Sequence, residues 1–319
     1  MVSDNKGHYG SAELDELHTS VNSSTENGAC LTGHLSDFKN FRNRQSCNYR
    51  YQAYEQAKNE PRIKERLHSY KTVTISNPLN TSAREAESGK MAPAYYCATL
   101  PIPQDGDWDI DGPKRDILRK TFEDKTVKIR RGRNFTQDTW PYWHNAHHLI
   151  PKGTLKDEIL KEPSPVNELI QVALLKAKYN VNHKLNMLFI PQDQEVAELL
   201  NLPRHIQRKD GDAPDVPANY GNHPLYNKMV REIKKGLDTI ITDYRSICEK
   251  AITAVEEEHD IPNPSLDKKK LEELSETLLQ MLLGWGAGAA GKSNRSQGRS
   301  LDARAKEHLE QNAKRARRD

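Results

Sequence analysis

Apolar residues recur at helical spacing over three long stretches of the chain. The clearest lies at 164–180, where Ser164 is a suitable capping residue, Pro165 suits the first helical position, and apolar residues follow three and four apart. A second run with the same period covers 229–255, which is enough for one long helix or two helices in line. A third run, at 265–284, begins at a serine and ends at a glycine. These patterns predict a largely helical C-terminal half.

Shorter segments favour strands. Residues 181–192 place an Asn-rich turn before a short apolar run that ends at a proline, which predicts a turn and then a strand. The basic stretch 126–133 is β-prone, and the patterns at 70–78 and 93–103 indicate two more strands. Apolar residues at helical spacing predict a helix over 112–124. The elements together predict an α+β fold that is mostly helical.

The composition limits how much of the chain can form a core. Of 319 residues, 35% are hydrophobic and 29% are charged, so we expect polar extensions beside a packed domain. The chain has no apolar run of about eighteen residues and no secretory signal pattern, so we expect no membrane span and no leader. Its four cysteines are scattered without a Cys-x-x-Cys pair, which argues against a zinc ribbon.

The net charge of +3 is unevenly distributed. Residues 291–319 carry nine Lys or Arg against four Asp or Glu, a local net charge of +5. A Gly-rich segment precedes them, so we expect a flexible basic tail at 291–319. Such a tail is suited either to nucleic-acid binding or to keeping the protein in solution.

The segment "YWHNAHHLIPKG" (142–153) contains three of the twelve histidines, two of them adjacent. Further segments rich in Asn and His follow in the order "VNHKLNMLFIP" and "NYGNHPLY", each at a predicted junction between elements. Adjacent histidines at a strand end can serve two tasks, because neighbouring side chains point in different directions. A neutral imidazole is an apt general base for activating water, and a second imidazole is an apt metal ligand.

In these three segments the sequence resembles the AHH nucleases of the HNH/endonuclease VII superfamily. The resemblance covers about 135 to 245 and implies a ββα-metal nuclease core. We therefore expect a nuclease domain at 126–258, followed by a C-terminal helical segment at 259–290 and the basic tail. The role of the N-terminal region at 1–125 is not given by the sequence, and delivery or an adaptor function is one interpretation.

The resemblance also implies roles for individual residues. His147 and His223 match metal ligands, His148 matches the general base, and Asn186 matches the Asn that stabilises the loop around that base. These roles imply one divalent metal ion as cofactor.

The third ligand departs from the family pattern. The family has His-x-Gly-x-His-Pro, and Asn219 stands here at the first of those positions. Asn219 lies four residues before His223 and is the favoured ligand, since an amide oxygen can bind a hard ion such as magnesium. His205, across a loop, is the alternative. The metal can therefore be Mg, Mn or Zn.

Other residues near the motif have more general interpretations. Lys128, Arg130, Arg131 and Arg133 precede the site and are candidates for phosphate contacts. His144 and the aromatic residues around it, Trp140, Tyr142 and Trp143, are expected mainly to pack.

The resemblance implies a metal-dependent endonuclease that cuts DNA with little sequence preference. Members of this family commonly act as toxins delivered into competing bacteria, which implies a cognate immunity protein and a secretion-system component or adaptor as partners. We expect the protein in the cytoplasm of the producing bacterium. From there it would be secreted, without a signal peptide, into the cytoplasm of the target cell. The alternatives are an RNase toxin of the same fold, or a non-catalytic zinc-stabilised module that binds nucleic acid.

Overall fold

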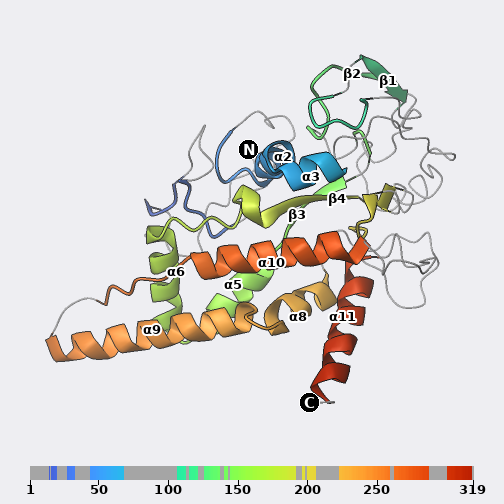
Figure 1. Cartoon of the computed structure of the whole chain (residues 1–319). Helices are drawn as coiled ribbons and strands as arrows, with labels where there is room; N and C mark the ends of the chain where they lie inside the picture. The colour runs from blue at the N-terminus through green and yellow to red at the C-terminus, as the bar shows by residue number, and fades with distance from the viewer. Residues whose placement is uncertain are drawn as a thin grey trace. The chain divides into compact units, whose positions relative to one another are not determined.

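The computed structural model (Figure 1) falls into two compact units, each assembled from three stretches of the chain. The first unit contains residues 1–53, 148–187 and 227–280, and the second contains 54–147, 188–226 and 281–319. The structure describes residues 14, 16–19, 27–32, 44–67, 106–112, 115–120, 126–136, 140–142, 144–191, 196–197, 200–205, 223–258, 262–286 and 300–317. The functional regions expected from the sequence, with boundaries after 125, 258 and 290, stay a prediction.

Three helices form the centre of the first unit. These are α5 (Lys152–Leu160), α6 (Val166–Lys176) and α9 (Leu237–Glu258), which pack against one another in pairs. Helix α6 confirms the helical period at 164–180, with Ile170 and Leu174 fully buried. The expected cap is wrong, because Pro165 and not Ser164 stands at the cap position. Helix α5, which directly follows the adjacent histidines, was not expected from the sequence.

The periodic run at 229–255 consists of two helices, α8 (Pro224–Glu232) and α9. They are separated at Gly236, where an added Cβ would lie 2.4 Å from the backbone oxygen of Arg231. Its neighbour Lys235 has a φ of 60°, so the chain leaves the helical path here. The period allowed one long helix or two helices, and the structure confirms two.

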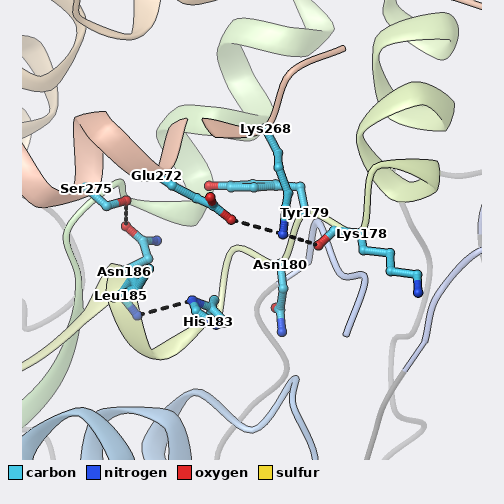
Figure 2. A pocket seen from close by; sticks show the side chains of 9 residues that line it. All are labelled: Lys178, Tyr179, Asn180, His183, Leu185, Asn186, Lys268, Glu272 and Ser275. Atoms are coloured by element: carbon cyan, nitrogen blue, oxygen red, sulfur yellow. Dashed lines mark hydrogen bonds and ion pairs between the residues drawn. The ribbon is translucent and has the colours of Figure 1, made fainter. Parts of the chain in front are cut away.

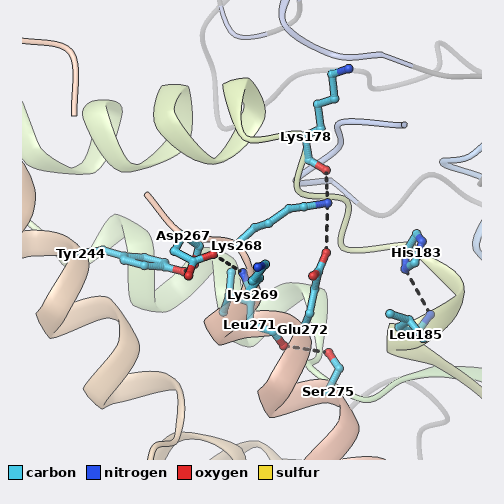
Figure 3. Close-up of polar contacts among 10 residues, drawn as sticks. All are labelled: Lys178, His183, Leu185, Tyr244, Asp267, Lys268, Lys269, Leu271, Glu272 and Ser275. Atoms are coloured by element: carbon cyan, nitrogen blue, oxygen red, sulfur yellow. Dashed lines mark hydrogen bonds and ion pairs between the residues drawn. The ribbon is translucent and has the colours of Figure 1, made fainter. Parts of the chain in front are cut away.

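Helix α10 (Lys269–Gly286) confirms the helix expected at 265–284, and its first turns lie in the first unit (Figure 3). Both expected ends are corrected, because the helix begins at Lys269 and not at Ser265, and it continues past Gly284. Asp267 caps the helix by accepting the N–H of Lys269 at 2.9 Å, and its backbone oxygen accepts the hydroxyl of Tyr244 at 2.6 Å. Lys268 forms an ion pair with Glu272 at 3.0 Å. These contacts fix the start of α10 against α9.

Part of the N-terminal region is ordered. It contains the helices α2 (Tyr49–Asn59) and α3 (Pro61–Leu67). Within the first unit, Cys30 pairs with the turn before β4, since its N–H donates to Tyr179 and its carbonyl accepts from Val181. The described N-terminal residues of the first unit therefore belong to the same compact body as that turn.

The second unit contains the hairpin of β1 (Ile117–Lys120) and β2 (Thr126–Ile129), which are antiparallel. The helix expected at 112–124 is therefore wrong. Ile117 and Ile129 are buried partners across the hairpin, whereas Leu118 is 64% exposed, which is the two-residue period of a strand. Strand β2 confirms the β-prone pattern at 126–133, and the strands expected at 70–78 and 93–103 lie outside the described residues.

A second sheet pairs β3 (His144–His148) with β4 (Met187–Pro191), and η4 (Lys184–Asn186) leads into β4. Helix α8 follows these strands in the chain, which is the order of a ββα core. The expected α+β, mostly helical fold is confirmed.

The expectation of a wholly flexible basic tail at 291–319 is corrected by helix α11 (Leu301–Ala316). Ser300 caps this helix by accepting the N–H of Ala303 at 3.2 Å, and its first turns bury Leu301 and Ala305. The high charge of the tail hid this short apolar period. Among the helices of the described ranges, none is long and apolar enough to cross a membrane.

Candidate metal centre and catalytic histidine

Three histidines of the second unit meet in one buried cluster. His147 lies in β3, His205 lies in the chain after β4, and His223 directly precedes α8. Nε2 of His205 lies 3.1 Å from Nδ1 of His147 and 3.4 Å from Nε2 of His223. One ring nitrogen of each residue lies within 4.8 Å of those of the other two.

The cluster fits a bound divalent ion. Nitrogen ligands about 2.0–2.1 Å from a tetrahedral ion lie about 3.3 Å apart, close to the two observed separations. The three side chains are 5–7% exposed, and burial lowers the pKa of His223 to about 4. A neutral imidazole is the form that binds a metal. Nδ1 of His223 is buried and has no hydrogen-bond partner among the described residues.

The structure thus brings His205, the alternative ligand, together with the two expected ligands. Asn219, the favoured one, lies outside the described residues. The spacing argument for Asn219 relied on the chain immediately before His223. The structure brings His205, eighteen residues before His223, to the cluster, and Asn219 as a ligand stays a prediction.

Asn145 is a site residue that the sequence analysis missed, although it belongs to the quoted Asn-Ala-His-His motif. Its side-chain amide nitrogen Nδ2 lies 2.9 Å from Nδ1 of His205. In this contact the amide nitrogen Nδ2 of Asn145 faces Nδ1 of His205, and the contact fixes the orientation of the imidazole ring. Asn145 is therefore placed to orient His205.

His148, the next residue of β3, belongs to the first unit. Its Nε2 lies 2.9 Å from Oδ1 of Asn182, and the ring of Tyr49 lies 5.4 Å from its own ring. The amide of Asn182 is oriented by Thr32, whose carbonyl accepts its N–H at 3.0 Å. The oxygen of Asn182 therefore faces His148, so Nε2 carries the imidazole proton and Nδ1 is the basic nitrogen.

Burial is the main cause that lowers the pKa of His148 to about 4, while the hydrogen bond with Asn182 acts in the opposite direction. The side chain is therefore neutral at pH 7, which is the state of a general base. Asn182 was also missed, although the Asn-rich turn that holds it was recognised.

Asn186 joins two stretches of backbone near the adjacent histidines. It is 3% exposed, and its amide oxygen accepts the N–H of Ile150 at 2.7 Å. Its amide nitrogen donates to the carbonyls of Ile150 at 3.1 Å and Val181 at 2.8 Å. These bonds tie the chain after the adjacent histidines to the turn before β4, as expected for the Asn that stabilises this loop.

Helix α10 completes the environment of Asn186, as Figure 2 shows. The hydroxyl of Ser275 donates to Oδ1 of Asn186 at 2.9 Å. The adjoining cavity has a volume of about 10 Å³, which is about the room that one water needs. Asn186 and Ser275 both line this cavity.

The four candidate phosphate-binding residues differ in their surroundings. Lys128 is exposed but forms an ion pair with Asp116 at 2.8 Å, and this contact lowers the pKa of Asp116. Arg130 and Arg131 are exposed after β2, and Arg133 is half-buried. The structure does not bring them into the histidine cluster.

The packing role expected for His144 is confirmed. Its ring is fully buried against Phe135, Tyr142 and Phe189, and its Nδ1 lies 2.7 Å from the backbone oxygen of Tyr142. Trp140 is likewise in the core, and Trp143 lies outside the described residues.

Comparison with known proteins identifies the segment that carries the site. Residues 130–266 match the family model AHH, described as a nuclease family of the HNH/ENDO VII superfamily with conserved AHH. No curated protein and no solved structure gave a match. The matched segment contains the adjacent histidines, His205 and His223. Residues 130–266 are therefore similar to the AHH nuclease family of the HNH/ENDO VII superfamily, a family of hydrolases that act on phosphodiester bonds.

Proposed function

We propose that the protein is an endonuclease that depends on one divalent metal ion, held by His147, His205 and His223. The observation that carries this proposal is the buried cluster of three imidazoles, whose nitrogens converge at 3.1 and 3.4 Å. A structural zinc site is ordinarily closed by four protein ligands, whereas a catalytic site has three and an open position. Three ligands are present among the described residues, which supports catalysis over a purely structural role.

In the proposed mechanism His148 is the general base. Asn182 holds Nε2–H of the imidazole, so Nδ1 accepts a proton from the attacking water. When bound, a divalent ion neutralises the charge that develops on the phosphate and on the leaving oxygen. His147 and His148 are consecutive residues of β3, so one strand end provides both a ligand and the base.

The ligand set favours a transition metal. Imidazole suits zinc and other transition ions, whereas magnesium prefers oxygen ligands. With His205 as the third ligand, and not Asn219, the expected metal is zinc or manganese and no longer magnesium. Metal titration of the metal-stripped protein with each ion tests this preference.

We propose DNA as the substrate. Exposed cations support binding to a phosphate backbone, and two groups of them lie after β2 and at the C-terminal end of α11. Incubating the pure protein with plasmid and with RNA, in the presence of metal or EDTA, tests the substrate. Cleavage of RNA alone would make the protein an RNase of the same fold, and no cleavage of either would favour a zinc-stabilised binding module.

We further propose that the nuclease is an antibacterial toxin that reaches the cytoplasm of a target bacterium through a secretion system or adaptor. The family resemblance of the motifs supports this role, and a toxin of this kind requires a cognate immunity protein in the producer. Induced expression in a bacterial cytoplasm should arrest growth with degraded DNA, whereas expression of His148→Ala should not. Equal growth arrest by both forms would contradict the toxin proposal.

A further inference from the structure

Helix α8 begins directly after a residue of the histidine cluster. His223 stands at the cap position, where a side chain ordinarily accepts the first free N–H groups of a helix. Its imidazole does not do so, and its Nε2 lies 3.4 Å from that of His205. Oδ1 of Asp302 instead accepts the N–H groups of Leu225 at 3.1 Å and Tyr226 at 3.0 Å. A carboxylate from a distant helix thus caps α8 and leaves His223 available to the cluster.

The same turn of α11 also holds the chain at His205. The N–H of Leu301 donates to the carbonyl of Arg204 at 3.0 Å, the residue immediately before His205. On the other side, the N–H of His205 donates to the carbonyl of Pro191 at 2.8 Å. The backbone at His205 is therefore fixed between β4 and the start of α11.

The third histidine is reached through an aromatic contact. The backbone N–H of Tyr226 donates to Asp302. The ring of Tyr226 lies 5.1 Å from the ring of His147 and 6.4 Å from the ring of Trp285. Tyr226 is fully buried, so its position is set by the first turn of α8. The placement of Asp302 therefore affects the surroundings of all three histidines.

The first turn of α11 is itself held firmly. Asp302 is 4% exposed and Leu301 is fully buried, while Ser300 provides the helix cap. Nη2 of Arg304 donates to the carbonyl of Trp285 at 2.6 Å. Burying a carboxylate is costly unless hydrogen bonds compensate it, and the two N–H groups at a helix N-terminus do so.

We infer that Asp302 is a positioning residue of the metal centre, which makes α11 part of the nuclease although it lies beyond the family-matched residues 130–266. The inference rests on the proposed function, because it takes the three histidines as the metal ligands. Asp302 acts by holding the start of α8, and therefore His223, at the distance from His205 that a shared ion needs.

Calorimetric titration of the metal-stripped full-length protein with zinc tests this inference. Asp302→Ala removes the acceptor and should weaken zinc binding by about 10- to 100-fold, the usual effect of losing a group that orients a ligand. Asp302→Asn keeps an acceptor oxygen and should bind zinc within about threefold of wild type. Glu310→Ala, which removes an exposed carboxylate from the same helix, is the matched control and should bind like wild type.

A loss of general stability gives a different result, because it lowers the unfolding temperature of the metal-free protein without changing the affinity of the folded fraction. If Asp302→Ala does not fold, Asp302→Glu, which displaces the carboxylate, replaces it and should also weaken zinc binding. If Asp302→Ala bound zinc with wild-type affinity, the inference would be overturned. The same holds for Asp302→Glu where the alanine variant does not fold. Failure of the wild-type protein to bind zinc or any other divalent ion would instead overturn the proposed metal centre itself.

Discussion

Changing Asn186 to aspartate alters one atom group and tests whether this residue acts through its hydrogen bonds. Asn186→Asp replaces the amide nitrogen, which donates to the carbonyls of Ile150 and Val181, by an oxygen that cannot donate. A buried acceptor left without a donor costs about 1–3 kcal/mol. Two such carbonyls predict a loss of about 2–6 kcal/mol in the free energy of unfolding.

Urea denaturation measures this loss, and plasmid nicking measures its effect on activity. Because the loop beside His148 is displaced, we expect cleavage to fall by about 100-fold, the effect of a small misplacement of a reacting group. The matched control is Asn263→Asp, since Asn263 is exposed and its Oδ1 accepts from Lys176. That variant should change stability by less than about 0.5 kcal/mol. If Asn186→Asp kept wild-type stability and activity, a positioning role through donated hydrogen bonds would be refuted.

Three further predictions concern the base and the binding of nucleic acid. His148→Ala should reduce cleavage by about 10²- to 10⁴-fold but leave the affinity for metal unchanged. Plasmid nicking measures the first effect and calorimetric metal titration the second. Loss of metal binding in this variant would contradict the assignment of His148 as base and His147 as ligand. Arg130→Ala should lower the salt dependence of DNA binding more than Lys128→Ala, because Lys128 is paired with Asp116, and equal slopes in a salt titration would contradict this difference. Alanine at three exposed cations at the C-terminal end of α11 should also flatten that slope, and an unchanged slope would assign this helix end to another role. These cations are Lys314 and Arg315 in the last turn and Arg317 at the cap position.

The residues of the histidine motifs could be predicted from the sequence because they are local. The Asn-Ala-His-His motif forms the end of β3. Pro224 suits the first position of a helix, so His223 directly before it is expected at a helix start. The third ligand could not be decided, because the chain between His205 and His223 forms no periodic pattern that determines where a loop returns. Geometry in the structure brings His205 to the cluster.

The supporting contacts could not be predicted because they join residues far apart in the chain. Ser275 reaches Asn186 across 89 positions, and Asp302 reaches Tyr226 across 76. No sequence period relates such pairs. The helix expected at 112–124 failed for a local reason, since a short apolar run fits either period until its burial is known, and Leu118 turns out to be exposed.

The central claim is that cleavage requires an ion held by His147, His205 and His223. Its most direct test is to strip the wild-type protein of metal, measure plasmid nicking, and titrate zinc or manganese back into wild type and into His205→Ala. We predict no nicking without metal, recovery with one ion per chain in the wild type, and metal affinity at least about 10-fold weaker in His205→Ala. Full nicking by the metal-stripped protein, or wild-type affinity in His205→Ala, would contradict the claim.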